Sequence, residues 1–161
     1  MILMAASVII EEMNGDSGSP TPSTATNMNF GSADVANLTV ATYPITCGTN
    51  SFSKWYRLHI TDMGTPASNL LNNIKIWKDS GVYKTDEVIN FKNTDTYVTP
   101  SATTVGGTAA IPTSAPATNV TGELAADEAY SYYMMLQLST SASTEAGSAN
   151  QKVIKVSYDE Q

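Results

Sequence analysis

The amino-acid sequence predicts an all-β protein that folds as an antiparallel β-sandwich. Short runs of alternating apolar and polar residues recur along the chain at roughly 8–12-residue spacing, which is typical of sandwiches. Turn-forming Gly, Pro, Asn, Asp and Ser residues separate these runs. Helix signals are confined to two short stretches, residues 65–73 and 121–130. Two architectures stay open, a jelly-roll-like sandwich and an immunoglobulin-like Greek key, although the single Cys47 excludes the disulfide of antibody domains.

Each predicted strand shows period-two alternation or enrichment in β-branched and aromatic residues. In chain order the predicted strands are Ser7–Met13, Asn27–Phe30, Lys54–Asp62, Asn73–Lys78, Glu87–Lys92, Asp95–Thr99, Thr103–Ile111, Thr118–Leu124, Tyr130–Thr140 and Lys152–Tyr158. The stretch NGDSGSPTPSTAT between the first two is rich in Pro, Ser, Gly and Thr, which predicts an extended or mobile linker. We therefore divide the chain into an N-terminal strand with a flexible arm, residues 1–26, and a sandwich domain, residues 27–161.

Alternation also assigns one face of each strand to the core, because successive side chains of a strand point to opposite faces. The residues predicted to point inward are Tyr56, Leu58 and Ile60; Ile74 and Ile76; Tyr130, Tyr132, Met134, Leu136 and Leu138; and Ile154, Val156 and Tyr158. These side chains are large enough to supply most of the stability, at about 25 cal/mol per Å² of buried apolar area.

The opposite faces carry more apolar side chains than a solvated sheet needs. Trp55, Trp77, Tyr133, Met135 and Val153 all fall on faces predicted to point outward. A β-bulge would swap the faces, or the N-terminal arm and the segment 111–119 would cover them. The functional interpretations are an apolar patch that contacts a partner protein and an aromatic platform that binds sugars. The candidate partner-contact residues are Trp55, Trp77, Tyr133 and Met135, together with Val8 and Ile10 of the first strand.

Composition excludes several function classes. Charged residues make up 14 % of the chain, against roughly 25 % in average proteins, and the formal net charge is −7. Such a surface repels phosphate backbones, and no basic cluster offsets it, so we predict no nucleic-acid binding. The N-terminal run MILMAASVII has no Lys or Arg before it and is shorter than the 20 or so residues of a membrane span. We therefore predict neither a signal peptide nor a membrane segment.

No pattern of catalytic residues is present, so we predict a protein that is not an enzyme and uses no cofactor. His59 is the only histidine, and we interpret it as a surface residue. The glycines of VGGTAA, residues 105–110, lack the Lys-Ser/Thr pair of a phosphate loop. Glu11 and Glu12 are adjacent on a predicted strand and therefore point to opposite faces, which makes a poor acid–base pair. No spacing of Asp residues matches a known calcium loop, and we predict no metal site.

Four segments resemble small virion proteins of tailed bacteriophages. Members of that group pair a K-x-[aromatic]-R strand with an N-[IL]-K-[aromatic]-W-K-S-G strand. They close with YSDY…MQLQ…STASAG…TFTFQYDE. In this chain Lys54–Arg57, Asn73–Gly81, Tyr130–Leu138 and Ser141–Glu160 occupy those places, and NFGSADVANLTVATYPI is similar to the segment before the first of them.

The resemblance implies a capsid decoration (cement) protein. It implies that the major capsid protein and other copies of the chain are its partners. It also implies that the protein is found in the virion after assembly in the host cytoplasm. The alternative is a carbohydrate-binding module or tail-associated adhesin, with a glycan as ligand. Trp55, Trp77 and Tyr133 would then be its stacking rings.

Overall fold

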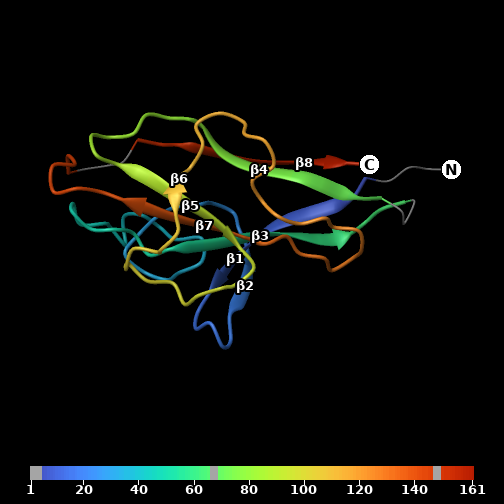
Figure 1. Ribbon diagram of the computed structural model, residues 1–161. Helices are drawn as coiled ribbons and strands as arrows, with labels where there is room; N and C mark the ends of the chain where they lie inside the picture. Colours follow the sequence, from blue (N-terminus) through green and yellow to red (C-terminus); the bar gives the residue numbers. More distant parts are fainter. Residues whose placement is uncertain (1–4, 66–68, 147–149) are drawn as a thin grey trace.

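The computed structural model describes residues 5–65, 69–146 and 150–161, in which all regular structure is β-strand (Figure 1). The strands are β1 (Ser7–Asn14), β2 (Thr21–Thr24), β3 (Lys54–Asp62), β4 (Leu71–Ser80), β5 (Val88–Thr94), β6 (Ala109–Ala110), β7 (Tyr133–Ser139) and β8 (Val153–Glu160). A six-stranded sheet has the order β2-β1-β3-β7-β5-β6, and β4 and β8 form a second sheet. All pairings are antiparallel, so the prediction of an all-β sandwich is confirmed.

The strands with the clearest alternation are confirmed, and the polar ones are not. Six predicted strands match β1, β3, β4, β5, β7 and β8, with β3 correct at both ends. Asn27–Phe30 and Asp95–Thr99 are irregular, Thr103–Ile111 shrinks to β6, and Thr118–Leu124 retains one bridge, between Leu124 and Leu71. The helical turn predicted at 121–130 is absent, and the one at 65–73 falls partly on residues 66–68, outside the described residues.

The N-terminal segment is part of the six-stranded sheet. β1 and β2 form a hairpin whose turn includes Gly15 at φ +89°, and β1 pairs with β3 from Ser7 to Met13. β1 confirms the strand predicted at Ser7–Met13, whereas the residues after it, predicted as an extended or mobile linker, turn back and pair with β1 as β2. A Pro- and Thr-rich segment suits an edge strand, since Pro22 lies where no ladder hydrogen bond is needed from its nitrogen.

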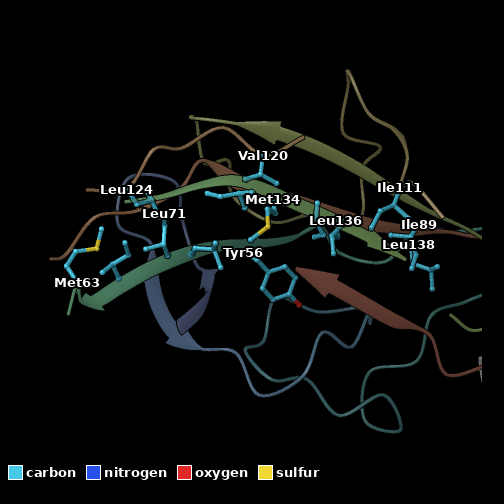
Figure 2. Close-up of a cluster of buried hydrophobic side chains, with 14 residues drawn as sticks. Tyr56, Met63, Leu71, Ile89, Ile111, Val120, Leu124, Met134, Leu136 and Leu138 are labelled. Carbon is cyan, nitrogen blue, oxygen red and sulfur yellow. The ribbon is translucent and has the colours of Figure 1, made fainter. Parts of the chain in front are cut away.

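The main core lies between the two sheets, as Figure 2 shows. It contains the predicted inward residues of β3 and β4, all at most 2 % exposed, and Met134, Leu136 and Leu138 of β7. The predicted inward residues of β8 are only partly buried. Burial weakens toward β8 because no described strand lies beyond that strand in its sheet.

A buried ion pair lies at one end of this core. Lys54 Nζ lies 2.5 Å from Glu12 Oε1, and both side chains are 1 % exposed. The remaining polar atoms are satisfied by a surface segment, since Lys54 also donates to the Val35 carbonyl and the Asn37 N–H donates to Glu12. The pair therefore joins β1, β3 and the segment 34–37. Burial raises the pKa of the neighbouring Tyr56 hydroxyl well above its usual value, and the charge of Glu12 adds to that shift.

Candidate interaction surfaces

The outer face of the six-stranded sheet carries a second apolar cluster. Met13, Trp55, Tyr97 and Met135 form it, with Tyr133 packed at its margin. Trp55 is 1 % exposed and Met135 is 0 % exposed. These two candidate partner-contact residues therefore lie on the predicted face but are covered by the protein itself.

Most of the cover comes from the loop after β5, with Met13 of the N-terminal segment beside it, and none comes from the predicted segment 111–119. Tyr97 lies in this loop, with its ring centroid 5.4 Å from that of Trp55 and 5.8 Å from that of Tyr133. Its hydroxyl donates a 2.7 Å hydrogen bond to the Gly15 carbonyl in the β1–β2 turn. Burial is the main reason that the pKa of Tyr97 is raised. The apolar residues of YVTP, residues 97–100, could have indicated a covering loop, but the same residues are also typical of a strand.

A buried amide anchors the rest of the same loop. Gln137 of β7 is 1 % exposed, and its Nε2 donates to the carbonyls of Ser51, Ser101 and Thr103. Its Oε1 accepts from the Val105 N–H. Beside this anchor is a depression of about 400 Å³, lined by Ser53, Trp55, Lys92, Val98, Thr99, Ser101, Thr103, Thr104, Val105 and Gly106. Its rim is mostly neutral hydroxyl and aliphatic groups.

Trp77 lies apart from this cluster. It belongs to β4 in the other sheet, where it is half-buried and its Nε1 donates to Asp79 at 3.2 Å. A hydrogen bond from Lys155 lowers the pKa of Asp79, with Trp77 as a further contributor. The predicted grouping of Trp77 with Trp55, Tyr133 and Met135 on one surface is therefore wrong.

A charged network occupies the other end of the outer face. Glu11 accepts from Arg57 at 2.8 Å and lies 2.8 Å from His59 Nδ1, while His59 Nε2 lies 3.0 Å from Glu128. Tyr130 packs against the side chains of Arg57 and His59, with its ring centroid 3.7 Å from Arg57 Cζ and 4.4 Å from the His59 ring centroid. His59 is 8 % exposed, so its interpretation as a surface residue is wrong.

Tyr130 and Tyr132 are the exposed aromatic residues that the alternation placed in the core. They are 39 % and 40 % exposed. The side chain of Ser131 explains the difference, because its Oγ accepts the Leu58 N–H and so takes the place of a main-chain carbonyl in the ladder. This irregularity offsets the segment before β7 from the alternation within β7.

Val8 and Ile10 are the candidate contact residues on β1. Both are partly buried and pack against the main core from β1. At the same end of the molecule, the Ala6 N–H donates to Glu160 Oε1 at 2.8 Å, which brings the end of β8 to the beginning of β1. The start of β1, which carries Val8, therefore lies near the end of β8.

The side chains that could bind a metal ion are scattered over the described residues. No group of three or more His, Cys, Asp or Glu residues among them is placed to hold a metal ion. His59 is held between two carboxylates, and Cys47 is half-buried and forms no disulfide. In the same part of the chain, no helix has the length and apolar character needed to cross a bilayer.

Comparison with known proteins returned no match to a protein-family model, a curated protein or a solved structure.

Proposed function

We propose that this protein is a non-enzymatic structural component of a tailed-bacteriophage virion. In this proposal it decorates or cements the capsid shell by binding the major capsid protein and other copies of itself. The resemblance of four segments to small phage virion proteins supports the proposal. The low content of charged residues agrees with it, since much of the surface of a shell protein faces other subunits.

The observation that carries the proposal is the incomplete second layer of the sandwich. The six-stranded sheet is covered by a sheet of two strands, and β8 is an edge of that sheet. Ile154, Val156 and Tyr158 on β8 and Val8 and Ile10 on β1 stay partly buried at this edge. A strand supplied by another chain would cover these side chains and pair with the main chain of β8.

The residues that carry the resemblance have structural roles in this chain. Lys54 forms the buried ion pair with Glu12, and Arg57 binds Glu11. Lys78 donates to the Gly81 carbonyl at 2.6 Å, which holds the turn after β4. Residues that maintain a scaffold are what a virion structural protein needs, and none of these contacts leaves a reactive group free.

The test is binding to capsid shells of the phage that encodes the chain, prepared without this protein. We expect many copies to bind each shell, as counted by co-sedimentation and electron microscopy of the particles. Val8→Asp is expected to reduce binding strongly because it places a charge in the partly buried surface. Val98→Asp is the matched control, since Val98 is 53 % exposed and lies beside Trp55 on the outer face of the six-stranded sheet, away from β8. Binding of a few copies at the tail, or no binding, would contradict the proposal.

A carbohydrate-binding adhesin is the second candidate, and the exposed ring of Tyr130 favours it. Trp55 is too buried to stack on a sugar, and Trp77 lies on the other sheet. Tyr130 is 39 % exposed and is held against Arg57, so it presents a fixed aromatic ring beside the carboxylate of Glu128. Glycan-array binding that Tyr130→Ala abolishes, without a change in melting temperature, would support this candidate over the first.

A further inference from the structure

We infer that two copies of this chain associate by antiparallel pairing of their β8 edges about Val156. The two second sheets then become one four-stranded sheet with the order β4-β8-β8-β4. The inference names the partner at the edge on which the proposed function rests, and it concerns association in solution, which is measured without any shell.

The β8 edge is the only one of the four sheet edges that is both long and uncovered in the described residues. β2 has four residues and contains Pro22, and β6 has two residues. Both are poor templates for a further strand, because Pro lacks the N–H donor and short edges offer few hydrogen bonds. β8 has eight residues and, within the described chain, pairs with β4 alone.

The outer edge of β4 is covered by the segment 112–124. The Asn119 side chain accepts from the Ile76 N–H at 2.9 Å and donates to the Ile76 carbonyl at 2.9 Å, as a paired strand would. The Lys78 N–H donates to the Pro112 carbonyl, and Leu71 exchanges both main-chain hydrogen bonds with Leu124. The outer edge of β4 therefore has its main-chain groups paired, whereas the outer edge of β8 has no such partner among the described residues.

The same contacts show which main-chain groups of β8 are unpaired. Ile76 and Lys78 direct their main-chain groups away from β8, and their cross-strand neighbours are Val156 and Ile154. Opposite residues of an antiparallel pair share this orientation, so Val156 and Ile154 direct their N–H and C=O groups away from β4. Period two extends the pattern to Tyr158. An antiparallel strand at this edge would satisfy all three residues.

The sequence of side chains along β8 favours pairing with a second copy of β8, and it favours one register of that pairing. Pairing about Val156 places Val156 opposite the partner's Val156 and Ile154 opposite the partner's Tyr158, so the core-facing side chains meet one another. A shift of two residues places Tyr158 opposite the partner's Lys152 in one direction, or Ile154 opposite the partner's Glu160 in the other. A shift of four residues places Val156 itself opposite one of these charged residues, so the register about Val156 is the one in which all three core-facing side chains meet apolar partners. Lys152 is already bound to Glu87 at 2.8 Å in its own chain. Hydrophobic pattern sets strand register, and here it favours the symmetric one.

The added strand would also cover the exposed side of Val8 and Ile10. The segment 112–124 joins β4 to the β5–β7 side of the molecule, since the Tyr132 N–H donates to Thr121 and the Thr121 N–H donates to Asn93. β8 is therefore on the β1 side, in agreement with the contact between Ala6 and Glu160. A strand beyond β8 extends the second sheet over the half-buried part of β1.

The test uses opposite charges at Ser157, which is half-buried and faces the partner's Lys155 in this register. We expect sedimentation equilibrium of the full chain to show a dimer. Ser157→Lys places like charges directly opposite at two symmetric positions, and at low salt it is expected to raise the Kd at least about tenfold. Ser157→Glu, the matched variant, is expected to lower the Kd or leave it unchanged. Circular dichroism melting of each variant shows whether the monomer fold is retained.

A second variant tests the register through a covalent link between the two strands. Lys155→Cys with Ser157→Cys, in a Cys47→Ser background, places two pairs of thiols at non-hydrogen-bonded positions, where the Cα atoms of antiparallel strands are about 4.5 Å apart. Oxidation is expected to give a covalent dimer. A wild-type chain that stays monomeric at millimolar concentration, or a dimer that neither charge variant nor the thiols affect, would overturn the inference. Loss of shell binding by a chain that still dimerises would instead refute the proposed function alone.

Discussion

The two faces of the β1–β3 pair carry the same kinds of charged residue in opposite environments. Glu12 and Lys54 point into the sandwich, where each side chain is 1 % exposed and the segment 34–37 satisfies the remaining atoms. Glu11 points outward to Arg57 and His59, and that network ends at Glu128, whose side chain is 69 % exposed. Adjacent glutamates on one strand thus differ because alternation sends them to different faces.

The comparison shows that the strand position of a charge decides its energetic role. An inner charge has exchanged all its water for fixed partners, so removal of one partner leaves the other uncompensated. The outer network is also largely buried, with Glu11 7 % exposed, but it reaches solvent through the side chains of Arg57 and Glu128, which are 17 % and 69 % exposed. Solvent and salt therefore weaken its contacts more than those of the inner pair. Part of the outer face is not exposed to solvent, because the Trp55 cluster is as deeply buried as the core.

The largest effect is expected at that cluster. Trp55→Ala should lower the free energy of unfolding by about 3–5 kcal/mol, as for other buried aromatic residues replaced by Ala. The measurement is urea denaturation followed by circular dichroism. Trp77→Ala is the matched control and is expected to cost less, since that ring is half-buried. Equal losses for the two variants would show that the outer cluster does not behave as a core.

The inner ion pair should give the next largest effect. Lys54→Met should lower the free energy of unfolding by about 3 kcal/mol, because Glu12 would stay buried without its partner. The double variant Lys54→Met with Glu12→Leu should recover most of the loss, since no buried charge remains. A double-mutant cycle in denaturant measures both. Additive losses in the double variant would contradict the assignment of the cost to an unpaired charge.

A smaller effect that depends on salt is expected on the outer face. Arg57→Met should lower the free energy of unfolding by about 1–2 kcal/mol at low salt, through its hydrogen bonds to Glu11 and its contact with Tyr130. In 1 M NaCl, where screening acts within about 3 Å, the difference from wild type should shrink. The loss in Lys54→Met should stay nearly constant with salt. Equal salt dependence in both variants would remove the distinction between the faces.

The smallest effect is a gain at Tyr56. Its hydroxyl is buried and has no hydrogen-bond partner among the described residues, so Tyr56→Phe should raise the free energy of unfolding by about 1 kcal/mol. The raised pKa means that the folded state holds this proton more tightly than the unfolded state. The stabilisation is complete below the unfolded pKa of roughly 10 and is lost as the pH rises through the folded value. Denaturation at pH 8 and above pH 10 should therefore show that the free energy of unfolding falls less with rising pH in Tyr56→Phe than in the wild type.

Alternation was sufficient to predict the sandwich and the part of its core that β3, β4 and β7 supply. β3 was predicted at both ends, and Tyr56, Leu58 and Ile60 are buried as expected. Period-two patterns succeed here because each strand has one face against the core, so local sequence and tertiary environment agree. The predicted outward face of Trp55 and Met135 was also right.

The contacts between distant segments were not predictable in the same way. Tyr97 covers Trp55 through a hydrogen bond to Gly15, which is 82 residues away in the sequence. Asn119 and Gln137 satisfy main-chain groups with side-chain amides, so the segments they hold need no strand pairing. A polar residue gives no periodic signal for such a role. The open β8 edge was likewise hidden, because edge and central strands alternate alike.

The covered edge of β4 has a further consequence for chemical modification. Asn119, Val120 and Thr121 match the acceptor pattern for N-linked glycosylation. Yet Asn119 Nδ2, the atom that would carry the sugar, donates to the Ile76 carbonyl, and Oδ1 accepts from the same residue. A glycan at Nδ2 would separate the segment 112–124 from β4 and expose a second long edge. In a secretory compartment, the folded chain should therefore remain unmodified at this position, and a chain modified before folding should aggregate through β4.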